Sequence, residues 1–116
     1  MQENVVYVDQ AEGLKRVMQN AKLYVKLLNK FKVDFKTKPA ELLTAVKAEQ
    51  YESAQGVAHT IKGTAANLGM AELYKQSLAV EGQIKDGTVS PESAQVLQTC
   101  FDHTVSAIDA VLKQYE

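Results

Sequence analysis

His59 lies in a segment whose apolar residues recur at intervals of three and four, as in the core-facing seam of a helix. The seam consists of Tyr51, Ala54, Ala58, Ile61, Ala65 and Leu68. Each residue of an α-helix turns by about 100°, so His59 lies roughly 130° from the centre of the seam. The spacing therefore predicts a helix that presents an imidazole to solvent, where the ring can act as a nucleophile.

Small and basic residues surround this histidine on the predicted exposed flank. Gly56 and Gly63 lie on the same side as His59, although a glycine inside a helix costs about 1 kcal/mol relative to alanine. A missing side chain lets another surface approach the helix backbone closely, so the pattern favours access over stability. Lys62 follows His59 by three residues and is its neighbour on the helix surface, where a mobile ammonium can attract a phosphoryl group.

Glu81 stands on a face of the next predicted helix that should be buried. That inner face is assigned to Met70, Leu73, Tyr74, Ser77, Leu78 and Ile84. Glu81 falls within about 20° of the middle of this face, and a glutamate there needs a partner. Because the two helices follow each other through a short turn and should pack antiparallel, Glu81 can accept a hydrogen bond from Nδ1–H of His59, which leaves Nε2 free. In the alternative, Glu81 lies near the end of the bundle and reaches water.

The helical pattern continues through almost the whole chain. Helices are expected over about residues 10–19, 23–35, 50–67 and 70–85, and two more begin at Pro39 and at Pro91. Four longer helices with short connections indicate an all-α fold, an antiparallel four-helix bundle with one or two short additional N-terminal helices. The third helix either belongs to the bundle or leads into the fourth. Since no repeat or linker interrupts the chain, residues 1–116 are expected to form a single domain.

The segment around the histidine resembles the signature of histidine-containing phosphotransfer (HPt) domains. Residues 58–69 are Ala-His-Thr-Ile-Lys-Gly-Thr-Ala-Ala-Asn-Leu-Gly. The family pattern is a histidine, two residues, Lys-Gly, five residues and a second glycine; it is matched in order and spacing by His59, Lys62, Gly63 and Gly69. The opening helices also look like those of the family, so the resemblance covers nearly the whole chain.

The resemblance implies a four-helix bundle in which His59 is the phosphorylation site. It also implies that Lys62 lies near the phosphoryl group, that Gly63 leaves room for a receiver domain, and that Glu81, 22 residues after the histidine, bonds to its ring. The expected function is the relay of a phosphoryl group between receiver-domain aspartates in a multistep two-component phosphorelay. The expected partners are response-regulator receiver domains, with a hybrid sensor histidine kinase as a further candidate.

The partner is expected to dock on the exposed side of the histidine helix. The residues assigned to this surface are Gln55, Gly56, Gly63, Ala66 and Asn67. Exposed apolar residues of the first two helices are further candidates, namely Leu14, Val17 and Met18. No intrinsic cofactor and no metal site are expected, because no carboxylate cluster resembles one. The Mg²⁺ that phosphoryl transfer needs is expected in the acidic pocket of the partner receiver.

Two other functions remain open on the sequence. One is a helical adaptor that binds receiver domains without carrying phosphate, although the intact His59 and Lys62 argue against it. The other is the HPt domain of a chemotaxis-type kinase, which a separate catalytic domain charges from ATP. An autonomous enzyme is not expected, since the chain has no phosphate-binding glycine loop and no nucleophile triad. His103 is expected to be solvated and Cys100 to be a small core residue.

Composition and charge exclude several classes of partner. The formal net charge is -1 and no basic stripe stands out, so nucleic acid is not expected as a partner. No run approaches the roughly 18 apolar residues of a membrane span. Cys100 is the single cysteine and cannot form an internal disulfide, so a reducing cytoplasm fits. The chain is expected to act as a monomer.

Overall fold

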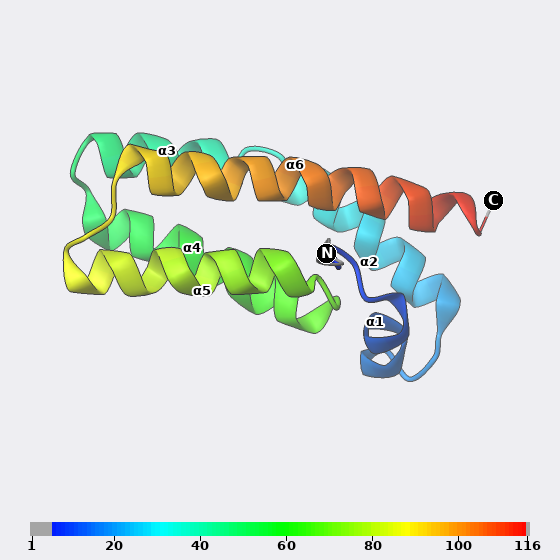
Figure 1. The fold of residues 1–116 in the computed structure, drawn as a ribbon. Helices are drawn as coiled ribbons and strands as arrows, with labels where there is room; N and C mark the ends of the chain where they lie inside the picture. The colour runs from blue at the N-terminus through cyan, green and yellow to red at the C-terminus, as the bar shows by residue number, and fades with distance from the viewer. Residues whose placement is uncertain (1–5, 116) are drawn as a thin grey trace, which may run out of the picture.

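The computed structural model describes residues 6–115, so the two ends of the predicted domain, residues 1–5 and 116, lie outside the described residues. All regular secondary structure in the described range is helical (Figure 1). The helices in chain order are α1 (Gln10–Arg16), α2 (Ala21–Asp34), α3 (Lys38–Lys47), α4 (Tyr51–Asn67), α5 (Ala71–Asp86) and α6 (Pro91–Lys113).

The last four of these helices form an antiparallel bundle (Figure 1). α4 packs against both α3 and α5, and α6 closes the bundle against the same two helices. α2 packs against α6 at one end of the bundle, and α1 packs against α2. This arrangement confirms the all-α bundle with additional N-terminal helices. The third helix, whose place the sequence left open, is a bundle member.

Local signals in the sequence set several helix ends. The side chains of Asp9 and Asn20 accept hydrogen bonds from backbone N–H groups in the first turns of α1 and α2. Ser90 caps α6 in the same way, and Pro91 occupies the first turn of that helix. Gly87 ends α5 with a left-handed φ of 75°. These short-range interactions depend on the sequence next to each helix end and not on the bundle.

α1 is shorter than the sequence predicts. The helix expected to run to about Gln19 ends at Arg16, and Met18 and Gln19 have φ values of 57° and 63°. A residue with positive φ cannot continue a right-handed helix. The apolar spacing that predicted the longer helix carries no information about this change of φ.

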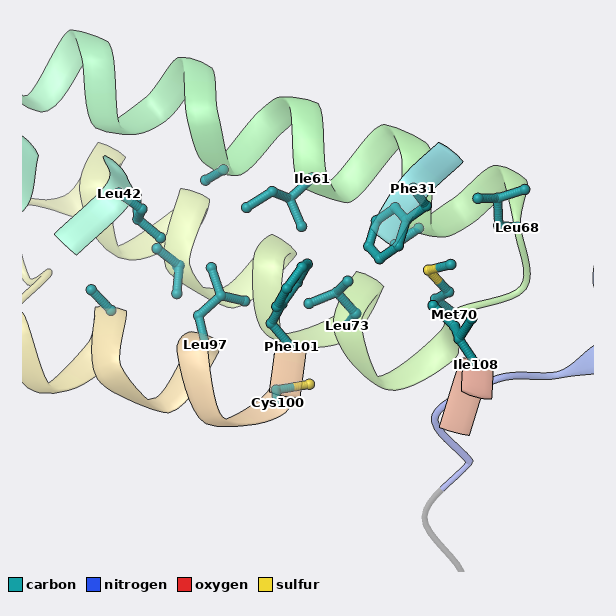
Figure 2. Packing of buried hydrophobic residues seen from close by; sticks show 14 of the residues in the cluster. Phe31, Leu42, Ile61, Leu68, Met70, Leu73, Leu97, Cys100, Phe101 and Ile108 are labelled. Atoms are coloured by element: carbon teal, nitrogen blue, oxygen red, sulfur yellow. The ribbon is translucent and has the colours of Figure 1, made fainter. Parts of the chain in front are cut away.

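Apolar side chains from every bundle helix meet in the core (Figure 2). Leu42, Ile61, Leu73 and Leu97 come from α3, α4, α5 and α6 in that order, and each is fully buried. Phe31 of α2 is also buried, so the second helix contributes to the same core.

Within residues 6–115, no helix combines the length and the apolar character that crossing a membrane requires.

α4 turns mainly alanines toward the core. Ala54, Ala58 and Ala65 have no exposed surface. The distance between two packed helices depends on the side chains at their contact, so these small residues let α4 approach α3 and α5 closely. Side chains at the edge of the seam can therefore reach directly from α5 to α4.

Most of the predicted inner face of α5 is buried, but two of its residues are not. The spacing predicts Tyr74 and Leu78 on the inner side, but these residues are 38% and 47% exposed. The residues that α5 buries are Leu73, Ser77, Val80, Glu81 and Ile84. Two rows of apolar residues compete on this helix, and the neighbouring helices cover the row that contains Leu73 and Val80. Tyr74 and Leu78 therefore point outward.

α1 is attached to the turn between α4 and α5 by close backbone contacts. Asp9 donates its backbone N–H to the carbonyl oxygen of Gly69 at 2.6 Å. A Cβ atom at Gly13 would lie 2.5 Å from Cε1 of Tyr24 and 2.9 Å from the backbone oxygen of Leu68. α1 can lie this close to its neighbours only because position 13 has no side chain.

Gly13→Ala is expected to lower the free energy of unfolding by about 1–3 kcal/mol, because the added methyl group overpacks against Tyr24 and the backbone. The matched variant Gly63→Ala is expected to raise it by up to about 1 kcal/mol, since alanine is the better helix former and no neighbouring atom lies within 4 Å of the new Cβ. Urea unfolding followed by circular dichroism measures both values. Equal stability of the two variants would contradict the packing around Gly13.

Candidate functional site

His59 occupies the centre of α4 and points to solvent. Its side chain is 68% exposed, whereas Ala58 and Ile61 on the opposite side of the helix are fully buried. The structure therefore places the imidazole on the outer face, as the apolar seam predicts. An accessible ring on a rigid helix is suited to nucleophilic attack on a group that a partner brings to it.

A buried carboxylate from α5 holds the ring of His59. Nδ1 of the histidine lies 3.0 Å from Oε2 of Glu81, whose side chain is 5% exposed. An ionised carboxylate only accepts hydrogen bonds, so Nδ1 carries the hydrogen and Nε2 of the neutral ring is free. The hydrogen bond expected between these residues is thus present, and Glu81 does not reach out to water at the end of the bundle.

The other oxygen of the same carboxylate binds Lys62. Nζ of Lys62 lies 2.5 Å from Oε1 of Glu81, and the lysine side chain is 22% exposed. The hydrogen bond from Lys62 lowers the pKa of Glu81 below its ordinary value; burial opposes this effect, and the hydrogen bond from His59 adds to it. Glu81 is therefore ionised at neutral pH and shared between a lysine and a histidine.

The ion pair between Lys62 and Glu81 was not predicted from the sequence. The two residues are 19 positions apart on different helices, so no local spacing links them. The predicted burial of Glu81 could have indicated a second partner. A buried carboxylate has two oxygens that need hydrogen bonds, and His59 satisfies only one of them. In the structure, the ammonium of Lys62 binds this carboxylate. A contact between Lys62 and a phosphoryl group stays a prediction.

The residues predicted to meet a partner surround His59 on the outer side of α4. Gly56, Gly63 and Asn67 are exposed, and Gln55 and Ala66 are half-buried. Apart from its own helix, the chain has no atom within 4 Å of a Cβ built on either glycine. No internal packing therefore requires glycine at these positions, which supports the interpretation that the surface is left open for a partner.

The N-terminal candidates for the docking surface differ in exposure. Met18 is 90% exposed, whereas Leu14 and Val17 are half-buried and pack against the core. α1 borders a cleft of about 340 Å³ that residues of α1, α4 and α5 line together, including Ala66. The first helix therefore adds a wall beside the C-terminal half of α4.

Other reactive side chains lack this combination of features. The ring of His103 is exposed and stacks on Tyr7, with 5.3 Å between the ring centroids. Cys100 is buried, and burial raises the pKa of its thiol to about 11, so little thiolate forms at neutral pH. Within residues 6–115, no group of three or more His, Cys, Asp or Glu residues is arranged to hold a metal ion.

Comparison with protein families matches the chain to one described as the Hpt domain. The match covers residues 26–111, about three quarters of the chain, and includes α3, α4, α5 and nearly all of α6. The curated proteins and the solved structures gave no match.

Glu81→Gln is expected to lower the free energy of unfolding at neutral pH by about 1–3 kcal/mol, because Lys62 loses its charged partner. A carboxyl group whose folded pKa is lowered stabilises the fold above its unfolded pKa, and this contribution is lost as the pH falls through the folded pKa. Stability should therefore fall less steeply on acidification in the variant than in the wild type.

Urea unfolding at a series of pH values between about 3 and 7 measures this difference. Glu52→Gln is the matched control, because it removes an exposed glutamate of α4 and should keep the wild-type dependence on pH. A wild-type dependence in Glu81→Gln would contradict the assigned coupling between Glu81 and its two partners.

Proposed function

The chain belongs to the Hpt domain family, and from that premise we propose that His59 accepts a phosphoryl group from one receiver-domain aspartate and passes it to another. Members of this family act in histidine phosphotransfer within phosphorelays. The observation that carries the proposal is the exposed ring of His59, whose Nδ1 donates to the buried carboxylate of Glu81. This hydrogen bond leaves Nε2 as the nucleophile.

In the proposed transfer, the lone pair of Nε2 attacks the phosphorus of an aspartyl phosphate in line with the leaving carboxylate. The N–P bond forms as the P–O bond to the aspartate breaks, and the electron pair of the broken bond leaves with the carboxylate. Nδ1 of His59 keeps its hydrogen, so the phosphorylated ring is cationic, and the adjacent carboxylate of Glu81 stabilises it. Transfer to a second receiver reverses these steps.

Lys62 is the residue that we expect to supply positive charge to the transferred phosphoryl group. It follows His59 by three residues, and its ammonium is anchored to Glu81 at 2.5 Å. From this position the flexible side chain can bring its charge to the oxygens of a phosphoryl group on Nε2. Glu81 then orders both the ring and the cation that act in the transfer.

The proposed role needs no cofactor bound by this chain. Phosphoryl transfer from an aspartyl phosphate uses Mg²⁺, which we assign to the acidic pocket of the partner receiver. We expect response-regulator receiver domains and a hybrid sensor histidine kinase as partners. We also expect the chain to work in the cytoplasm as a monomer that carries the phosphoryl group and has no autonomous catalytic activity.

Incubation with phosphorylated receiver domains is expected to label the wild type and His103→Gln, but not His59→Gln. His103→Gln is the matched control, because His103 is the other histidine of the chain and is also exposed. The label should be labile in acid and stable in base, as a phosphoramidate bond is.

Each other result of this labelling experiment has a defined meaning. Label that persists in His59→Gln would contradict the assigned site. Receiver binding without any label would favour a phosphate-independent adaptor. Label that appears only with ATP and a separate kinase domain would favour the HPt domain of a chemotaxis-type kinase.

Glu81→Ala is expected to slow transfer from a phosphorylated receiver by roughly five- to thirtyfold, as the loss of a hydrogen bond worth about 1–2 kcal/mol would. Glu81→Gln should lose less, because its amide oxygen can still accept the hydrogen of Nδ1. Single-turnover rates of the three proteins measure the effect. Equal rates in all three would show that Glu81 does not position the ring for transfer.

A further inference from the structure

α5 carries an exposed apolar row beside the histidine that the proposed transfer does not use. Tyr74 and Leu78 are 38% and 47% exposed. Gly82 follows Leu78 by the same interval of four that separates Leu78 from Tyr74, so the three residues form one ridge along the helix. Tyr74, Leu78 and Gly82 are referred to below as the α5 row.

The α5 row lies on the side of α5 that adjoins α4. Glu81 directly precedes Gly82, and its side chain reaches His59 on α4. Tyr74 lines the same cleft as Ala66, which lies about two helical turns after His59. α4 and α5 pack side by side and antiparallel (Figure 1). The α5 row therefore runs alongside the row of His59 and Ala66.

Gly82 has the same open surroundings as the glycines next to the histidine. Among the helical glycines of residues 6–115, Gly13 has neighbouring atoms close to its Cβ position, whereas Gly56, Gly63 and Gly82 have none within 4 Å. Each of these three costs about 1 kcal/mol of helix stability relative to alanine, and no contact inside the chain explains it. Since all three lie around His59, their missing side chains point to the close approach of a partner.

The charges beside the α5 row suit an acidic partner. Lys62 and Lys85 lie near Glu81, and after the Lys62 hydrogen bond their positive charges also lower the pKa of this carboxyl. Glu81 itself is buried, so the negative charge is covered while Lys85 is exposed. A receiver presents its aspartyl phosphate in an acidic pocket, and the exposed charge of Lys85, close to the carboxylate that binds His59, is complementary to it.

We propose that the α5 row is the apolar half of the surface on which a receiver domain docks. Apolar receiver side chains pack against Tyr74 and Leu78, and the receiver backbone approaches α5 at Gly82. The receiver then spans α4 and α5, with its acidic pocket above His59. This inference rests on the proposed function, because it takes the phosphoryl donor as the occupant of the surface.

An exposed valine on another helix provides a matched control. Val96 of α6 is 55% exposed and lines a groove between α5 and α6 that includes His103. The groove contains neither His59 nor Glu81. A substitution at Val96 therefore changes an exposed apolar residue outside the proposed docking surface.

The test compares Leu78→Asp and Gly82→Leu with Val96→Asp. Transfer from a phosphorylated receiver is measured over a range of receiver concentrations, and labelling by free phosphoramidate reports the reactivity of His59 without docking. Both α5-row variants should need a roughly tenfold higher receiver concentration for half-maximal transfer. Their labelling by phosphoramidate should match the wild type, and Val96→Asp should match it in both assays.

The possible failures are distinguishable. Normal transfer to the wild type with unchanged concentration dependence in both α5-row variants would overturn the docking surface and leave the proposed function intact. An equal defect in Val96→Asp would also overturn it, because the effect would then be independent of position. If phosphoramidate labels the wild type but no receiver does, both the proposed function and this surface fail. Circular dichroism checks folding, and Gly82→Leu decides the result if Leu78→Asp does not fold.

Discussion

The buried carboxylate of Glu81 both orients the ring of His59 and constrains how α4 and α5 pack. Glu81 of α5 has one oxygen on Nδ1 of His59 and the other on Nζ of Lys62. A charge removed from water is costly unless partners satisfy it, so α5 has to hold Glu81 opposite these two residues of α4. A shift of either helix by one turn, about 5.4 Å, would leave the carboxylate unpaired. The interaction that orients the imidazole therefore also sets the alignment of the two helices.

α4 uses small residues on both faces, for different physical reasons. On the inner face, Ala54 and Ala58 let the neighbouring helices approach, which brings Glu81 within reach of the ring. On the outer face, Gly56 and Gly63 have no neighbouring atom near their Cβ positions and lower the intrinsic stability of the helix. The sequence of α4 has a low helix propensity, so packing against α3 and α5 has to provide most of the stability of this helix. The carboxylate of Glu81 thus holds the ring of His59 from the bundle side, and the solvent side of the ring stays accessible.

The predictable parts of the fold were those that depend on residues close in sequence. The face of α4 that carries His59 follows from the spacing of its seam, and the cap at Ser90 follows from neighbouring residues. On α5 the same spacing permits two inner faces, and the wrong one was chosen for Tyr74 and Leu78 because only the positions of α4 and α6 select between them. The early end of α1 escaped prediction because apolar spacing does not encode a change in the sign of φ.

The sequence by itself determined which groups share the outer face of α4, since 3.6 residues per turn make His59, Lys62 and Gly63 neighbours whatever surrounds the helix. It also determined the family, because the signature lies within one helix and the turn after it. Only the tertiary structure decided that a single carboxylate serves both His59 and Lys62, and that an apolar row of α5 lies exposed beside them. The physical reason is that the rise and turn of a helix fix distances within it, whereas distances between helices depend on how all the core side chains pack.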